Sequence, residues 1–144
     1  NLKVDAATEA AVDISSVNFT VELVYIDGAT SQDFSIPLMI VPTGGVKIRK
    51  AQVMYDTTIT ADAAAYWTAN LQTIAAVVIG TRNTETGVGG TATADAVNDL
   101  TLTASVCDQV AGTVLELFMD AATADSADLS AISGVLNIEY QPNQ

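Results

Sequence analysis

The ionisable side chains of this 144-residue chain are mostly carboxylates: 17 Asp and Glu stand against five Lys and Arg, with one Cys and no His. The absence of His excludes Ser-His-Asp and Cys-His catalysis and the commonest zinc and iron sites. A pair of carboxylates could still hydrolyse glycosides. Such sites normally add aromatic platforms for sugar rings, whereas here one Trp and four Tyr are scattered along the chain. We therefore expect a protein that is not an enzyme and has no catalytic residues.

The segment "DAATADSAD" places Asp120, Asp125 and Asp128 close together. Calcium favours oxygen ligands in such loops, but the spacing differs from that of an EF-hand. Asx-turns and strand ends explain the same residues. We predict no metal and no cofactor, and calcium at these three residues stays an open alternative. The single cysteine, Cys107, fits a small buried hydrophobe better than a reactive thiol, and it cannot form an internal disulfide, which favours assembly in a reducing cytoplasm.

Three of the five basic residues, Lys47, Arg49 and Lys50, lie within the stretch "VKIRKAQVMYD". One interpretation is a solvated strand, with Lys47 and Arg49 on one side, Lys50 on the other, and nearby acids balancing them. The other is an interface, because acidic copies that pack side by side need opposite charge at the contact. We name these three residues, hereafter the basic cluster, as the candidate interface.

Charge and hydropathy also limit the partners. The net charge of −12 opposes direct binding to nucleic acid, because phosphate contacts depend on Lys and Arg. The longest aliphatic run, Ile74 to Gly80, is far shorter than the roughly 20 residues of a membrane helix. We therefore expect no nucleic-acid partner and no contact with a membrane.

The elements that must position these residues are predicted to be strands, because apolar residues alternate with polar ones along most of the chain. Strands are expected in 18–27, 33–41, 46–56, 75–82, 99–108, 112–120 and 134–140. Pro37 cannot donate to a ladder, which places its strand at a sheet edge or a bulge. The stretch 60–74 is ambiguous: a short helix capped by Thr60 or Asp62 is slightly favoured over a strand from Tyr66. Residues 83–99 read as a long exposed loop.

Seven to eight short strands separated by turns predict one all-β domain, an antiparallel sandwich or barrel. The first sixteen residues are Ala-rich with weak alternation, so we divide the chain into an extended N-terminal arm, residues 1–16, and a single β-sandwich domain, residues 17–144.

Two long stretches resemble the small jelly-roll decoration (cement) proteins and related head accessory proteins of tailed-bacteriophage capsids. "FSIPLMIVPTGGVKIRKAQVMYDTTITADAAAYWTANLQTI" is similar to their strand, turn and strand followed by small residues and an aromatic. "AGTVLELFMDAATADSADLSAISGVLNIEYQ" is similar to their late strand, polar connector and closing strand. The resemblance covers roughly residues 34 to 142 and is one of pattern and composition.

The resemblance implies a jelly-roll-like virion protein that is assembled in the bacterial host cytoplasm and sits on the capsid surface. It implies a homotrimer over junctions between subunits of the major capsid protein, which stabilises the shell, with the arm reaching along the shell or a neighbour. It carries over no single functional residue. Two alternatives stay open: an exported filament, fibre or surface-layer subunit, and a carbohydrate-binding jelly-roll module, which would need Tyr66 and Trp67 as an exposed aromatic pair.

Overall fold

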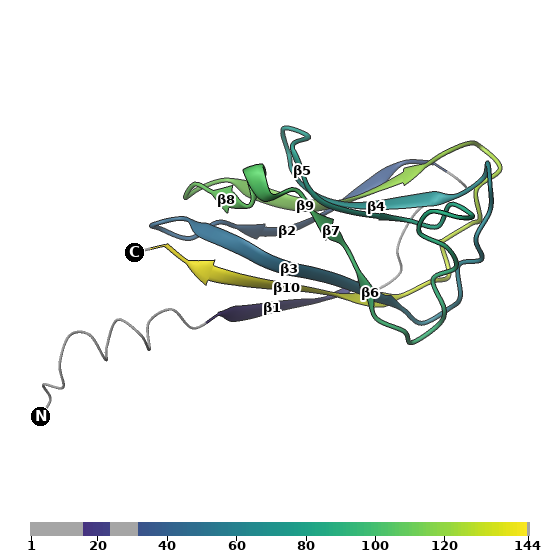
Figure 1. Cartoon of the computed structure of the whole chain (residues 1–144), viewed down its shortest axis with the longest axis horizontal. Helices are drawn as coiled ribbons and strands as arrows, with labels where there is room; N and C mark the ends of the chain where they lie inside the picture. Colours follow the sequence, from purple (N-terminus) through teal and green to yellow (C-terminus); the bar gives the residue numbers. More distant parts are fainter. Residues whose placement is uncertain (1–15, 24–31, 144) are drawn as a thin grey trace, which may run out of the picture.

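The computed structural model describes residues 16–23 and 32–143. Two antiparallel sheets face each other (Figure 1) and form a sandwich. The predicted arm, residues 1–16, lies outside the described residues except for Ser16. The same holds for residues 24–31, which include the end of the first predicted strand.

The two sheets are named here by their most central long strands. The β3 sheet has the order β1-β10-β3-β6, with β8 also paired to β3, and the β9 sheet has the order β2-β9-β4-β5-β7. The strands are β1 (Val17–Leu23), β2 (Phe34–Ile40), β3 (Val46–Tyr55), β4 (Trp67–Thr73), β5 (Val78–Asn83), β6 (Asn98–Asp99), β7 (Thr101–Leu102), β8 (Asp108–Gln109), β9 (Val114–Ala121) and β10 (Gly134–Pro142). A 3-10 turn, η1 (Ala104–Val106), is the one helical element among the described residues.

The connectivity is that of a jelly roll. The first strand pairs with the last, β1 with β10, and β2 pairs with β9. The strands between these follow the same nested order. β3 pairs with β6 and β8, and β4 pairs with β5. Taking β6 to β8 as one interrupted strand gives the eight strands of this architecture. The predicted all-β antiparallel sandwich is confirmed, and seven of the ten strands in the described part of the chain have six or more residues.

The core lies between the sheets because inward and outward positions alternate along each strand. Leu71 of β4 and Leu117 of β9 are opposite each other in the ladder, and both side chains are fully buried. Leu136 and Ile138 of β10 close the core from the other sheet, as the period-two pattern predicts. Trp67 is the largest fully buried side chain, and its ring meets that of Phe34 edge to face at 5.9 Å.

The favoured helix in residues 60–74 is wrong, because Trp67–Thr73 is a strand. Its backbone pairs with β9 on one side and β5 on the other, which satisfies the groups that a helix would have satisfied internally. Asp62 therefore caps no helix. Its carboxylate accepts hydrogen bonds from the backbone N–H groups of Ala64 and Ala65, at 2.8 and 2.7 Å, and holds a local bend before the chain enters β4.

Of two further predictions, the one for Pro37 is confirmed and the one for residues 99–108 is wrong. Pro37 lies both on an edge strand and beside a register shift, between Pro37 and Met39, as expected. The stretch 99–108 is not one strand: it breaks into β6, β7 and β8, with η1 between the last two. Cys107 therefore follows η1 instead of lying within a strand, but its side chain is buried, which confirms the interpretation as a small hydrophobe.

Candidate functional site

The basic cluster lies on β3, and a β-bulge determines which way its side chains point. The ladder between β3 and β10 pairs Lys50 with Glu139 and Ile48 with Tyr140, which leaves Arg49 as the extra residue. Val46 and Ile48 face the core before the bulge, and Ala51 faces it afterwards. A bulge inserts one residue and lets two consecutive residues point to the same side. Arg49 and Lys50 are both exposed, and Lys47 is half-buried.

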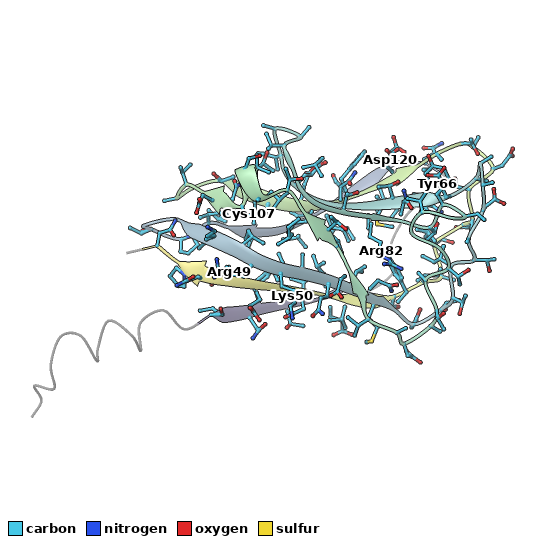
Figure 2. All side chains as sticks on the ribbon, in the orientation of Figure 1. Arg49, Lys50, Tyr66, Arg82, Cys107 and Asp120 are labelled. Atoms are coloured by element: carbon cyan, nitrogen blue, oxygen red, sulfur yellow. The ribbon has the colours of Figure 1, made fainter. Side chains whose placement is uncertain are left out.

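The prediction that Lys50 points to the opposite side from Lys47 and Arg49 is therefore wrong. All three side chains belong to the outer face of the β3 sheet, and Figure 2 shows Arg49 and Lys50 on the side of the sheet away from the other layer. A signal for this was present in the sequence. Apolar residues of β3 occupy even positions up to Ile48 and, apart from Met54, odd positions from Ala51 onward, and such a change of phase is expected where one residue is inserted.

The acids nearest in the ladder are distributed unevenly among the three basic residues. Lys50 is directly opposite Glu139 on β10, and Lys47 is opposite Asp108 on β8. Among the described strands, none places a residue opposite Arg49. Opposite-charge pairs across a sheet contribute roughly 0.2–1 kcal/mol each, so Lys47 and Lys50 are partly balanced within the chain. Arg49 is the residue of the basic cluster with most of its charge available to a partner.

Next to the basic cluster, the outer face of the β3 sheet has a polar centre, and an apolar hollow follows toward the end of β3. Asn137 of β10 donates to Asn18 of β1 at 3.3 Å and accepts from the Thr20 hydroxyl at 3.1 Å. Gln52 of β3 donates to Asp99 at 2.8 Å. Beyond these residues a shallow hollow of about 150 Å³ is lined by Met54, Val97 and Val135, among others. A basic end, a polar centre and an apolar hollow on one face form a surface suited to binding a protein.

A second hollow, of about 450 Å³, is lined by residues of the loops that follow β3 and β9. These loops lie at the opposite end of the sandwich from the start of β3 (Figure 1). Thr57, Thr58, Asp62, Asp125 and Asp128 are among the residues that line this hollow. The backbone N–H groups of Ala65 and Ala64 lower the pKa of Asp62. Within the described parts of the chain, no three Asp, Glu, Cys or His side chains come close enough to hold a metal ion.

Asp120 does not join Asp125 and Asp128 in that hollow. It lies instead beside Asp33, where burial raises its pKa and the charge and side-chain hydrogen bond of Asp33 raise it further. The Asp33 carboxylate also accepts from the backbone N–H of Ala121 at 2.8 Å. The three aspartates that were grouped by sequence thus belong to two different places, and the pair formed by Asp120 was not predicted.

Arg82 is a second residue that sequence reasoning missed. It lies opposite inward-facing Ala69 in the ladder, and Figure 2 shows it between the layers. Its guanidinium donates to the carbonyl of Gly89 at 2.9 Å, while its buried Nε has no hydrogen-bond partner among residues 16–23 and 32–143. Burial raises the pKa of neighbouring Tyr55 well above its usual range, and Arg82 opposes that rise. Arg82 supports the loop 83–90 and contributes no charge to the basic cluster.

The aromatic pair that a carbohydrate-binding module would need is not on the surface. Trp67 is 1% exposed, and its indole N–H donates to the carbonyl of Ala127 at 2.7 Å. Tyr66 is half-buried beside it. Because Trp67 belongs to the core, it cannot stack on a sugar. The described part of the chain also contains no helix long and apolar enough to cross a membrane.

No model of a known protein family matches the chain, and no curated protein matches its sequence. Among solved structures, it is similar to a chain in the capsid asymmetric unit of cyanophage Pam1, with 16% identity and a TM-score of 0.45 over 88% of this chain and 83% of that one. It is also similar to a chain of infectious bursal disease virus, Gx strain, with 13% identity and a TM-score of 0.28 over 90% of this chain and 37% of that one. Both neighbours come from viral structures.

Proposed function

We propose that this protein is a structural component of a tailed-phage particle that binds the outside of the capsid and stabilises the shell by bridging capsid subunits. The observation that carries the proposal is the basic cluster, which holds three of the five Lys and Arg of a chain with net charge −12 on one outer face. The jelly-roll connectivity agrees with the resemblance noted in the sequence. The role is non-catalytic, and it needs no cofactor.

The electrostatics favour the outer face of the β3 sheet as the contact. A strongly acidic protein is repelled by any acidic surface unless the contacting region carries the opposite sign. Because of the bulge at Arg49, all three positive charges lie on the outer side of the sheet. Without it, strict alternation would point one of the two neighbours Arg49 and Lys50 toward the core. The partner is then an acidic surface of the major capsid protein. The resemblance implies that further copies of this chain also contact one another, as a homotrimer.

The test is co-sedimentation with purified capsids of the virus that encodes the chain, at low and at high salt. The variant Lys47→Gln/Arg49→Gln/Lys50→Gln should bind roughly threefold to a hundredfold more weakly, since exposed ion pairs contribute about 0.2–1 kcal/mol each. Binding by the natural chain should weaken between about 0.1 M and about 1 M NaCl, where the Debye length falls from about 10 Å to about 3 Å.

A charge-preserving control separates electrostatics from shape. Lys47→Arg/Arg49→Lys/Lys50→Arg keeps every charge and should bind like the natural chain. Attachment that is unchanged in the Gln variant and insensitive to salt would show that the cluster is ordinary surface. Pelleting of the protein without capsids would favour a filament subunit.

A further inference from the structure

Among the described strands, β1 and β2 each lie at an edge of their sheet, and the two differ in how well that edge is protected. β2, at the edge of the β9 sheet, carries Pro37 and a register shift, and both features hinder pairing with another strand. β1, at the edge of the β3 sheet, pairs with β10 over seven residues without any shift, and it contains neither Pro nor Lys. Within the described parts of the chain, no strand pairs with the outer side of β1 (Figure 1). Its outward N–H and C=O groups therefore form a regular template for another strand.

The sequence of β1 is complementary to itself in one antiparallel register. If two copies pair about a two-fold axis at Thr20, Asn18 lies opposite Glu22 and Phe19 lies opposite Val21. Residues that face each other then belong to the same side of the sheet, so polar residues meet polar ones and apolar residues meet apolar ones. Thr20 meets Thr20, and such pairs are favourable across strands. All seven residues of β1 take part.

Strand length favours this register, because only an axis at Thr20 pairs all seven residues of β1, and charge excludes one of the alternatives. A two-fold axis at Glu22 would place two carboxylates directly opposite each other, which is unfavourable, and it would use fewer residues. With the axis at Thr20, each Glu22 meets the amide of Asn18. Phe19 and Val21 are only half-buried in the single chain, and the facing strand would cover them further.

We infer that β1 is the self-association surface of this protein and that its partner is the β1 strand of a second copy. The contact is isologous and therefore gives a dimer, not the trimer implied by the resemblance. The two β3 sheets become one continuous sheet. Because the axis stands perpendicular to that sheet, both basic clusters lie on the same side. This inference does not depend on the proposed function, although two clusters on one face would strengthen attachment to any repeating acidic surface.

The test is the mass of the full chain by light scattering on a sizing column, where twice the 14.9 kDa of one chain is expected. Thr20→Lys places two like charges across the axis but faces neutral Asn137 within the chain. It should weaken the dimer at least about tenfold, and so should Thr20→Glu. A mixture of the two variants should restore the dimer. Ser35→Lys, which adds the same charge to the other edge strand, should leave the dimer unchanged.

Circular dichroism of each variant shows whether the fold persists. A natural chain that is a monomer or a trimer would overturn the inference. A dimer that survives both Thr20 variants, or variants that fold yet do not associate when mixed, would overturn it as well. None of these results depends on capsid binding, so the inference and the proposed function can fail separately.

Discussion

Trp67→Phe tests whether the indole belongs to the core or to a binding surface. Trp67 is 1% exposed, packs edge to face on Phe34, and donates from Nε1 to the carbonyl of Ala127 at 2.7 Å. The substitution keeps an aromatic ring but removes the hydrogen-bond donor and part of the volume. Replacing a buried Trp by Ala typically costs about 3–5 kcal/mol. Phe retains more than half of the side chain, so the cavity should cost about 1–2 kcal/mol.

The lost hydrogen bond adds to that cost. A neutral hydrogen bond contributes about 1 kcal/mol net, and Ala127 is exposed, so its carbonyl can be rehydrated in the variant. The expected loss in the free energy of unfolding is therefore about 2–3 kcal/mol. It is measured by urea unfolding followed by far-ultraviolet circular dichroism, because the variant has no Trp left to report by fluorescence.

The natural chain supplies a second measurement, since its one Trp is a selective fluorophore. Acrylamide should quench its fluorescence weakly in the folded state and strongly in urea. A loss of stability below about 0.5 kcal/mol, the range of ordinary surface substitutions, would refute the placement of the indole in the core. Strong quenching in the folded state would refute it independently and would revive the carbohydrate-binding alternative.

Two further substitutions test local features. Ala76 has a φ of +66° in the turn between β4 and β5, a left-handed conformation that costs a residue with a Cβ about 1–2 kcal/mol. Ala76→Gly should therefore raise the free energy of unfolding by about 0.5–1 kcal/mol after the entropy cost of Gly, whereas Ala75→Gly should lower it, and equal effects in urea unfolding would contradict this. The raised pKa of Asp120 means that the folded chain binds the carboxyl proton of Asp120 more tightly than the unfolded chain does. The free energy of unfolding therefore falls as the pH rises from the pKa of Asp in the unfolded chain, about 3.9, through the higher pKa of Asp120 in the folded chain. Asp120→Asn should thus raise the melting temperature at neutral pH and make no difference below about pH 4, and a difference that persists at pH 3 would contradict this cause.

Much of the fold could be predicted because the alternation of apolar and polar residues is a local property of a strand. The last two strands, β9 and β10, follow the predicted pattern: Leu115, Leu117 and Met119 of β9 are buried, with Glu116 and Phe118 on the other side. Pro37 also gave a correct prediction, because a residue without an N–H is restricted to edges and bulges wherever it occurs.

The helix between 60 and 74 was a wrong prediction because small and apolar residues fit either structure locally. In the fold, this segment lies between two strands: it pairs with β9 on one side and with β5 on the other. Two rows of backbone hydrogen bonds and the burial of Trp67 and Leu71 then outweigh helix propensity, which is a weak preference. A choice of this kind depends on partners that are distant in sequence.

The sequence by itself determined the class of the protein: an all-β domain, strongly acidic, without His, and with most of its positive charge in one strand. Only the tertiary structure decided where that charge points. The pairing of β3 with β10 makes Arg49 the inserted residue, and the bulge turns Arg49 and Lys50 outward together. The tertiary structure also separates Asp120 from Asp125 and Asp128, and it places Arg82 between the layers. Arg49, Asp120 and Arg82 all lie on strands, and the direction of a strand side chain follows from the register, which is set by the opposite strand.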